Sequence, residues 1–494
     1  MTVSIAAIPD YSDLGSSSNV TKDTWEAQLS RYSTYEYYYS GDVFDEAVDD
    51  AEIANPPSLY PVGINIVKML TQSLADATFG EWDTLPVWFT GRKGLEENKD
   101  TIEACKELDR ILFHSNTESN FLEMELHRML YGSSVLAIMP DLRSKGVKWI
   151  PIKPTTFFPV FHPHDKNLLL QATILTNITR EQAKAIYNYD TKKDEVLFEE
   201  YWDLKEHYVK LDRELKIKRY TGRNPYGVVP FVYIPRMRSI SVYGDSIADD
   251  VIPVQDEINM RIADIGEAVN LNAHPTRWGK NLPKAFTTRN YPIGSDVLWE
   301  LGRSFGEHQP EVGMLEVKNP IPKGSQEHIK WLYDWVRTSS FAPPIAFGED
   351  SGGGQRSGIT LEIRMLPLIK AVRKHRAYLR TGLRGAAYIT GKILQQKGWS
   401  RPRVVKCLLD GDVEADFSEI LPRDRAGLVD EVVKRLSTTP PSISLSSALK
   451  VLSSDASEEK RIQKMIDEYE LDINDSNDSL DDAQDVPQPT KEDD

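Results

Sequence analysis

The sequence predicts an α+β protein, and three observations lead to that fold class. Residues 25–113, and the long stretches after residue 244, carry apolar residues at spacings of three and four, which is typical of helices. Residues 145–235 are instead rich in β-branched and aromatic residues. A shorter segment, residues 273–324, is broken by Gly and Pro and lies between two helical stretches. We therefore expect a mixed α/β body, long helices and a small inserted α/β module.

Composition describes an ordinary globular chain with an acidic charge balance. The 494 residues are 40% hydrophobic and 27% charged, and such a length is enough for roughly three average domains. The net charge is −16 and the pI is about 5.2. A tight DNA-binding protein neutralises phosphates with a basic face. The negative charge therefore argues against a tight DNA-binding protein, but not against a protein that contacts DNA without binding it tightly.

The sequence gives no sign of a membrane segment, a signal peptide or a disulfide framework. Its longest apolar runs fall well short of the ~20 residues that span a bilayer. The N-terminus lacks the basic start and the apolar core of a signal peptide. The two cysteines, Cys105 and Cys407, fit a reducing compartment. We expect no membrane partner.

The N-terminal part is expected to be a mobile arm followed by helices. Residues 1–25 form the arm, because their first part is rich in Ser and Asp. Residues 64–80 then place Ile64, Val67 and Leu74 at near-helical spacing. Residues 121–141 are expected to be a helix that runs into a short apolar strand.

Residues 145–235 predict an antiparallel β region. Its clearest hairpin pattern has Val209 and Leu211 before a polar turn at Asp212–Glu214, with Leu215 and Ile217 after the turn. The segment "NPYGVVPFVYIP" is expected to close this region.

A long helix is predicted over residues 244–272. Pro253 is expected to kink it or to mark its effective start. Carboxylates gather in its first turns, where the helix dipole favours them: Asp245, Asp249, Asp250, Asp256 and Glu257. Apolar residues form a near-heptad seam, which suits a helix lying nearly parallel to its neighbours: Ile247, Val251, Val254, Ile258, Ile262, Ile265 and Val269.

Two further helices are predicted after the inserted segment. The first covers residues 325–340, is capped by Ser325, and has one apolar face made of Ile329, Leu332 and Val336. The second is capped by Ser357, runs to Gln396 and is kinked at Pro367.

The C-terminal part is predicted to be helical and then disordered. An apolar stripe is formed by Leu428, Val429, Val432, Val433 and Leu436. Asp455 and Glu458 form a capping-box variant before another helix. From Leu471 onward the chain has nine acidic residues against one lysine and few large apolar residues, so we expect disorder.

Residues 353–360, "GGQRSGIT", have the glycine spacing of a phosphate-binding P-loop. Such a loop cradles phosphates on backbone N–H groups and reaches the outer phosphates with a lysine. Here Ile359 stands where the lysine belongs, and a helix with a Pro-Pro segment precedes the loop where a strand is required. We therefore interpret residues 341–358 as a mobile glycine-rich loop between two helices.

Other candidate sites are weaker. His162, His164 and Asp165 could supply metal ligands, but no further ligand follows at a fixed spacing and Pro163 favours a solvated turn. No nucleophile signature surrounds a serine or either cysteine. We expect no metal site, no cofactor and no catalytic residues, and hence no enzyme.

The helix after the glycine loop is strongly basic, although the chain as a whole is acidic. From Arg364 to Lys397 there are nine Lys and Arg residues and no Asp or Glu. One interpretation is a basic strip that faces DNA. The other is a helix that pairs with acidic surfaces of its own fold or of a neighbouring subunit, which is favoured because the basic residues lie all around the helix. The candidates for either contact are Lys370, Arg373, Lys374 and Arg376.

The order of these parts resembles the portal proteins of tailed bacteriophages. The segments that carry the resemblance are "YGVVPFVYIP", "IADDVIPVQDEINMRIADI", "AHPTRWG", "PPIAFG", "SGGGQRSGITLEIRMLPLIKAVRKHRAYL" and "ILPRD". They occur in that order, with the inserted module between the third and the fourth, and the resemblance covers roughly residues 30–470.

The resemblance implies a portal-like fold with named parts. These are a mobile arm (1–25), a wing in two pieces (26–243 and 359–420, the second with the kinked helix), two stem helices (244–272 and 325–340), a clip (273–324), a tunnel loop (341–358), a helical crown (421–470) and a disordered acidic tail (471–494). The tunnel loop is expected to face DNA with Ser351, Gly352, Gly353, Gly354, Gln355, Arg356 and Ser357.

The resemblance also implies a function and a set of partners. Portal proteins form a ring, usually of twelve copies, at one vertex of the virion capsid, and double-stranded DNA is driven in by terminase and later leaves through the same channel. Expected partners are further copies of the chain (a dodecamer), non-specific DNA, the terminase large subunit, the major capsid and scaffold proteins and a head-completion adaptor. Assembly is expected in the host cytoplasm. The alternatives are another head-completion or adaptor protein, and a nucleotide-binding enzyme that uses residues 353–360.

Overall fold

In a computed structural model of the protein, residues 1–420 form one compact unit and residues 421–494 a second. The structure describes residues 18–44, 63–80, 86–92, 98–115, 117–213, 215–217, 221–238, 242–273, 277–281, 311–314, 323–347, 358–418, 420 and 432–437. In the second unit, residues 432–436 are helical and Val432 is buried. The predicted capping box at Asp455 and the acidic tail lie outside the described residues.

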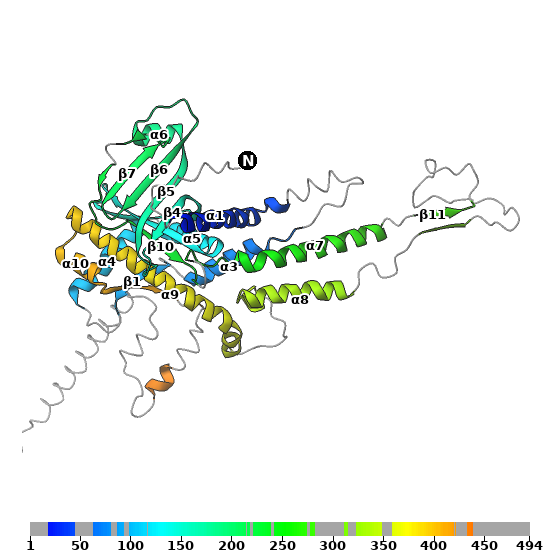
Figure 1. Cartoon of the computed structure of the whole chain (residues 1–494). Helices are drawn as coiled ribbons and strands as arrows, with labels where there is room; N and C mark the ends of the chain where they lie inside the picture. The colour runs from blue at the N-terminus through cyan, green and yellow to red at the C-terminus, as the bar shows by residue number, and fades with distance from the viewer. Residues whose placement is uncertain are drawn as a thin grey trace, which may run out of the picture. The chain divides into compact units, whose positions relative to one another are not determined.

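The first unit begins with helices, as the sequence predicts (Figure 1). They are α1 (Ser18–Ser40), α3 (Ile66–Phe79), α4 (Lys99–His114) and α5 (Thr117–Tyr131). Helix α1 begins inside the stretch that was assigned to the mobile arm. The strand β1 (Val87–Gly91) interrupts the helices and was not predicted, because five residues are too few to show a period.

Two antiparallel sheets follow, which confirms the predicted β region. The three-stranded sheet has the order β10-β2-β3, from β2 (Ser133–Asp141), β3 (Gly146–Ile152) and β10 (Phe231–Pro235). The six-stranded sheet has the order β4-β5-β6-β7-β8, with β9 paired to β7. Its strands are β4 (Phe157–Phe161), β5 (Leu169–Thr179), β6 (Glu195–Asp203), β7 (Glu206–Leu211), β8 (Leu215–Lys216) and β9 (Gly222–Arg223), and the short helix η1 (Pro154–Thr156) precedes β4.

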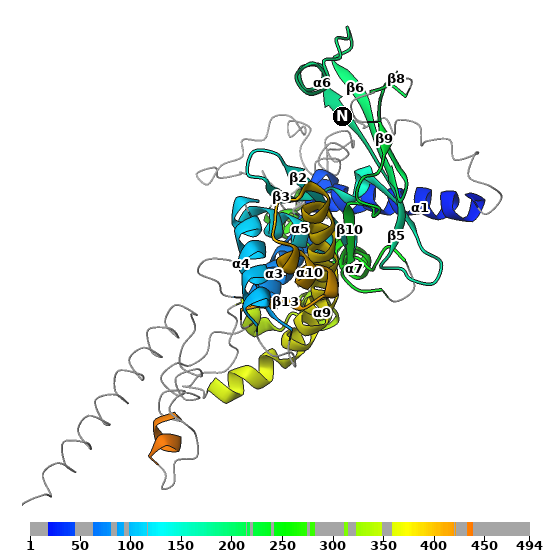
Figure 2. The same ribbon diagram turned by 90° about the vertical axis from the view of Figure 1, so that its left-hand side faces the viewer.

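The predicted hairpin at Asp212–Glu214 is confirmed, since Leu211 pairs with Leu215. Helix α6 (Arg180–Tyr187) was not predicted. It lies at the far end of the six-stranded sheet in Figure 2 and begins with a capping box between Thr179 and Gln182. Only Ala183 is buried along this helix, so its sequence carries almost no apolar period.

The remaining elements are long helices and short strands. Helix α7 (Ala248–Ala273) leads to a two-stranded antiparallel sheet of β11 (Arg277–Lys280) and β12 (Glu311–Met314). Helix α8 (Lys323–Ser339) then returns beside α7 in the opposite direction, as Figure 1 shows. After the short helix η3 (Pro344–Phe347) come α9 (Gly358–Lys397), α10 (Pro402–Asp410) and β13 (Val413–Phe417).

The long helices agree well with their predicted bounds. In the predicted seam of α7, Val251 and Ile258 are buried, but Val269 near the end of the helix is exposed. The predicted inner face of α8 is confirmed by the burial of Leu332 and Val336. The predicted cap at Ser325 is wrong, because α8 begins two residues earlier, at Lys323.

A close backbone approach fixes where α7 begins. Gly132, between α5 and β2, and Gly244, before α7, both have positive φ angles, of 81° and 94°. A Cβ on Gly244 would lie 2.1 Å from the carbonyl oxygen of Gly132, so a larger residue does not fit there. Ser246 then donates to the carbonyl of Leu130 and accepts from the Ala248 N–H, which ties the first turn of α7 to the end of α5.

Two buried clusters lie within the first unit. One joins α1, α3, α7 and α8 to the six-stranded sheet, and the other lies between α4, α5, α10 and the second half of α9. In the second cluster α9 lies directly on β10, because Gly382 leaves room for the side chain of Ile234. Trp149 of β3 donates to Thr390 of α9 over 3.0 Å. The second half of α9 is therefore a core helix.

The pairing of β1 with β13 joins the two sequence segments that the resemblance assigns to the wing. Val87 lies opposite Phe417 and Gly91 opposite Val413. Asp109 of α4 supports this ribbon, since its Oδ1 accepts from the Phe89 N–H over 3.2 Å. Burial raises the pKa of Asp109 to about 6.

We expect Asp109→Asn to stabilise the protein at neutral pH. The amide oxygen still accepts from Phe89, while the buried charge is removed. Because the folded-state pKa of Asp109 lies above its unfolded value, the carboxyl contributes stability below about pH 4 that is lost as the pH rises through about 6. The thermal midpoint should thus rise by about 1–3 °C at pH 7.5 and stay unchanged near pH 4. An equal shift at both pH values would contradict this account.

Candidate functional site

The glycine loop that the sequence singles out lies outside the described residues, but both of its flanks are described. The loop residues Ser351, Gly352, Gly353, Gly354, Gln355, Arg356 and Ser357 are not placed. Helices α8 and η3 come before the loop and α9 comes after it. A phosphate-binding P-loop follows a strand. The helical flanks confirm the context that argued against such a site.

Helix α9 presents one exposed stripe along its length. Its members recur at spacings of three and four: Ile363, Leu366, Lys370, Arg373, Ala377, Thr381 and Arg384. Lys374 is exposed beside this stripe. Arg376 and Leu379 lie on the opposite side and are buried. The basic residues surround the helix in sequence, but between Lys370 and Arg384 the fully exposed ones, Lys370, Arg373, Lys374 and Arg384, gather on one side.

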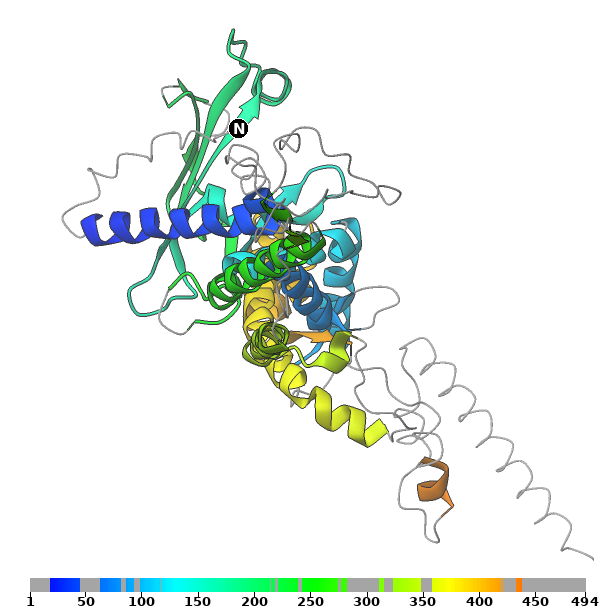
Figure 3. The ribbon, with the colours of Figure 1, turned by 90° about the vertical axis from the view of Figure 1, so that its right-hand side faces the viewer.

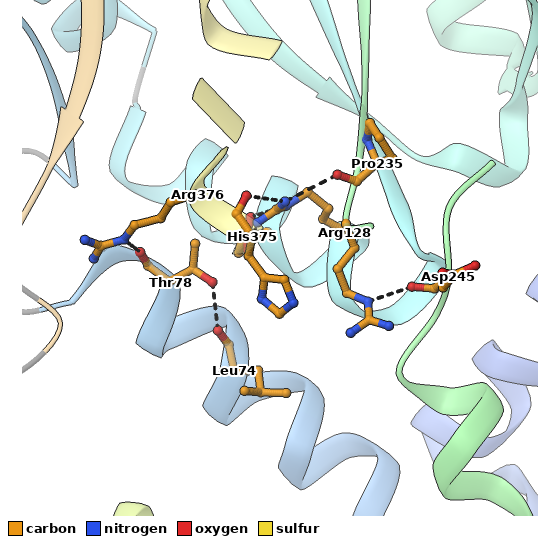
Figure 4. A network of polar contacts seen from close by, with 9 residues as sticks. Leu74, Thr78, Arg128, Pro235, Asp245, His375 and Arg376 are labelled. Atoms are coloured by element: carbon orange, nitrogen blue, oxygen red, sulfur yellow. Dashed lines mark hydrogen bonds and ion pairs between the residues drawn. The ribbon is translucent and has the colours of Figure 1, made fainter. Parts of the chain in front are cut away.

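Arg376 is engaged inside the subunit, as Figure 4 shows. Its Nε donates to the carbonyl of Thr78 over 2.7 Å, and its Nη1 donates to the carbonyl of Ser418 over 2.7 Å. The guanidinium also lies 5.2 Å from the centre of the Phe417 ring. Burial lowers the pKa of Arg376 to about 10, so it stays charged at neutral pH. Arg376 thus joins α9, the last turn of α3 and the end of β13.

A second buried guanidinium, that of Arg128 on α5, lies close to Arg376. It makes two hydrogen bonds with Glu125, of 2.6 and 2.7 Å, and both side chains are fully buried. Its Nη1 donates to the carbonyl of His375 over 3.0 Å and to that of Pro235 over 3.4 Å (Figure 4). A buried ion pair is costly to break, since the remaining charge would have no partner. This pair therefore fixes α9 and β10 on α5.

His375 lies beside these guanidinium groups. Its Nδ1 has no hydrogen-bond partner among the described residues. Burial, together with the charges of Arg128 and Arg236, holds the pKa of His375 well below its ordinary value. The ring is therefore neutral at pH 7, which limits the positive charge beneath α9.

The carboxylates in the first turns of α7 bind the tyrosine-rich helix α1. Asp249 accepts from Tyr35 Oη over 2.5 Å and from Arg31 Nη2 over 2.5 Å. Asp256 accepts from Tyr38 Oη over 2.8 Å. The sequence identified the carboxylates but not their partners, because the two helices are about two hundred residues apart in the chain.

Helix α7 also caps α3. Gln255 Oε1 accepts from the N–H groups of Ile66 and Val67 over 2.7 and 3.0 Å, which are first-turn amides without a partner inside α3. Asn259 Oδ1 accepts from the Ile64 N–H over 2.9 Å. The first half of α7 is thus fastened to both α1 and α3.

The outer side of α7 carries acidic residues around one methionine. Asp256, Met260, Asp264 and Glu267 follow one another at spacings of four, four and three, and all are exposed. We call these four residues the α7 stripe. Met260 is 55% exposed, and Asp264 pairs with Arg261 of the same helix over 3.0 Å.

The outer side of α8 carries two exposed tryptophans one turn apart. Trp331 is 60% exposed and Trp335 is 46% exposed. His328 stacks on Trp331 and lies 3.6 Å from the carboxylate of Glu257 on α7. Large exposed aromatic residues that are close together mark interaction surfaces. The sequence could have revealed them, since both lie outside the apolar face of Leu332 and Val336.

The segment from His162 to Asp165 is a turn between β4 and β5, as the sequence predicts. His162 Nδ1 accepts from the N–H groups of His164 and Asp165, both over 3.2 Å. Across the described ranges, no three His, Cys, Asp or Glu side chains are grouped so that they could hold a metal ion. No described helix is both long enough and apolar enough to span a bilayer.

A comparison with known protein families gives a match to this chain. The model of the family described as "Phage portal protein, SPP1 Gp6-like" matches residues 19–472, which is most of the chain. A search of curated proteins finds no relative.

We expect Arg376→Ala to destabilise the protein by about 2–4 kcal/mol, because the buried carbonyl of Thr78 and the partly buried carbonyl of Ser418 lose their donor. Arg376→Lys should recover little, since an ammonium group lacks the planar fork that reaches both carbonyls. The measurement is the thermal midpoint of the purified protein, with exposed Arg373→Ala as the matched control. Equal midpoints for Arg376→Ala and Arg373→Ala would refute the structural role of Arg376.

Proposed function

The chain belongs to the phage portal protein family, whose role is in DNA packaging, and from that membership we propose that it works as a closed ring around double-stranded DNA. The observation that carries this proposal is the family match, which extends from α1 to beyond the last described residue. Portal proteins are a structural family of the virion capsid vertex. We propose no enzymatic activity for this chain.

The exposed apolar residues of the long helices support assembly into a ring. Met260 on α7, Trp331 and Trp335 on α8, and Ile363 and Leu366 on α9 are all exposed in the single chain. An isolated subunit with these side chains in water is at risk of non-specific association. A cyclic assembly buries such surfaces and leaves no free edge.

We assign the parts of the portal as follows. The antiparallel pair of α7 and α8 forms the stem, and residues 273–324, which include β11 and β12, form the clip. The sheets with α1, α3 to α6, α9 and α10 form the wing (residues 26–243 and 359–420), and residues 421–470 form the crown. The proposed copy number is twelve, the clip binds terminase and later an adaptor, and the capsid and scaffold proteins surround the ring. DNA leaves through the same channel on ejection.

The proposed DNA contact is the tunnel loop, residues 341–358, with Ser351 to Ser357 nearest the DNA. Arg356 is its only cation between residues 341 and 358. A loop with few phosphate contacts leaves DNA free to slide, because each contact raises the salt-dependent affinity for DNA. Of the four basic candidates on α9, Lys370, Arg373 and Lys374 stay available for DNA or for another subunit, whereas Arg376 is used within its own subunit.

We expect the purified protein to form closed rings with a central hole in negative-stain electron microscopy. Trp331→Ser with Trp335→Ser should shift the ring toward smaller species, by about tenfold in the concentration needed for assembly, because the exposed aromatic pair is lost. Phe113→Ser, at an exposed aromatic residue of α4, is the control. A wild-type protein that stays monomeric or dimeric over a wide concentration range would overturn the proposed function.

Deletion of residues 351–355 should leave ring assembly unchanged but reduce DNA packaging or retention. The reason is that the segment is proposed to act on DNA rather than to hold subunits together. Ring formation is checked by light scattering, and packaging by the amount of nuclease-protected DNA in assembled particles. If the deletion abolished assembly, the segment would instead belong to the folding core of the subunit.

A further inference from the structure

We propose that the α7 stripe of one subunit packs on the first turns of α9 in the adjacent subunit. This inference rests on the proposed ring and names two surfaces that meet in it. One is the α7 stripe of Asp256, Met260, Asp264 and Glu267. The other is the first part of the α9 stripe, which we call the α9 patch: Ile363, Leu366, Lys370 and Arg373.

The α9 patch has the chemistry of a protein-binding surface. Ile363 is 61% exposed and Leu366 is 41% exposed, and both precede the cations on the same side of the helix. The first turns of α9 extend away from the sheets (Figure 3). No ion pair joins Lys370 or Arg373 to another residue in the described part of the chain. Bound DNA would neutralise Lys370 and Arg373, but Ile363 and Leu366 would stay exposed to water.

The α7 stripe is complementary to the α9 patch in the order and the spacing of its residues. Met260, Asp264 and Glu267 are spaced by four and three, and so are Leu366, Lys370 and Arg373. Each set therefore extends over about 10 Å of helix. An apolar residue followed by two acids can face an apolar residue followed by two bases.

Lys370 meets an acid whichever way the two helices run, whereas Arg373 meets one, Glu267, only if they are parallel. Asp256 lies one turn before Met260, and Asp264 lies one turn after it. With Met260 against Leu366, Lys370 meets Asp264 if the helices are parallel and Asp256 if they are antiparallel. Both carboxylates already have one partner, Arg261 for Asp264 and Tyr38 for Asp256, and a carboxylate can accept further hydrogen bonds.

A second copy of the chain is the occupant that the fold favours. Within one subunit α9 packs on α3, β10, β13 and α10, while α7 packs on α3 and α8. Apart from the hydrogen bond between Asp256 and Tyr38 of α1, both stripes are directed away from these contacts. In a cyclic assembly each subunit uses two different surfaces once, one toward each neighbour. The apolar contact provides burial, and the opposite charges select the correct pair of surfaces.

Charge reversal tests this pairing in the full-length protein. Lys370→Glu with Arg373→Glu should raise the concentration for half-maximal ring assembly by about tenfold or more, because acids then face acids. If the helices are parallel, Asp264→Lys with Glu267→Lys should do the same, and combining both pairs should restore rings. If they are antiparallel, Asp256→Lys with the α9 reversal should restore them instead. Arg403→Glu with Lys406→Glu, at exposed positions of α10, is the matched control.

Each outcome of this experiment shows whether a neighbouring subunit or DNA binds the α9 patch. Rings restored by a combined reversal support the proposal and exclude simple misfolding. Rings that persist in Lys370→Glu with Arg373→Glu, while salt-dependent binding to a DNA fragment weakens, would show that the α9 patch faces DNA and overturn it. Failure of every combined variant to restore rings would also overturn it. A wild-type protein without rings would remove the proposed function itself, and this inference with it.

Discussion

The arrangement of the subunit depends on two buried guanidinium groups beneath helix α9. Arg128 is fully buried with Glu125 and donates to carbonyls of α9 and of β10. Arg376 donates to carbonyls at the ends of α3 and β13. A buried cation without partners would cost far more than any single apolar contact contributes, so each one forces several backbone segments to stay in place. A neutral His375 beside them keeps a further positive charge out of the same space.

This constraint divides α9 into two functional halves. From His375 onward the helix is held by the guanidinium contacts and by the close approach of Gly382 to Ile234. Between Ile363 and Lys374, where exposure is described, most of its residues are exposed. The fixed half positions the projecting half, which leads directly to the glycine loop. In the proposed ring, such a rigid support would hold the loop at a set distance from the channel axis.

Most of the long elements could be predicted from the sequence, and most of the polar contacts could not. Helix α9 and the hairpin at Asp212–Glu214 follow from periods of 3.6 and 2 residues, which a single sequence displays. Helix α6 was missed because a short exposed helix has no apolar period. Arg373 and Arg376 look alike in sequence, and only tertiary partners show that the first is exposed and the second is bound. The loop residues 351–357 lie outside the described residues, so their DNA contact stays a prediction.

Helix α3 is held at both ends by other helices. Gln255 of α7 accepts from its first amides, and Arg376 of α9 donates to a carbonyl of its last turn. With 14 residues, α3 is about 21 Å long. Helix α3 therefore links the proposed stem directly to α9, the helix that follows the glycine loop. A displacement of α7 along its axis would shift α3 and, through α3, would shift α9 without involving the sheets. A movement of the proposed stem would then change the position of the loop.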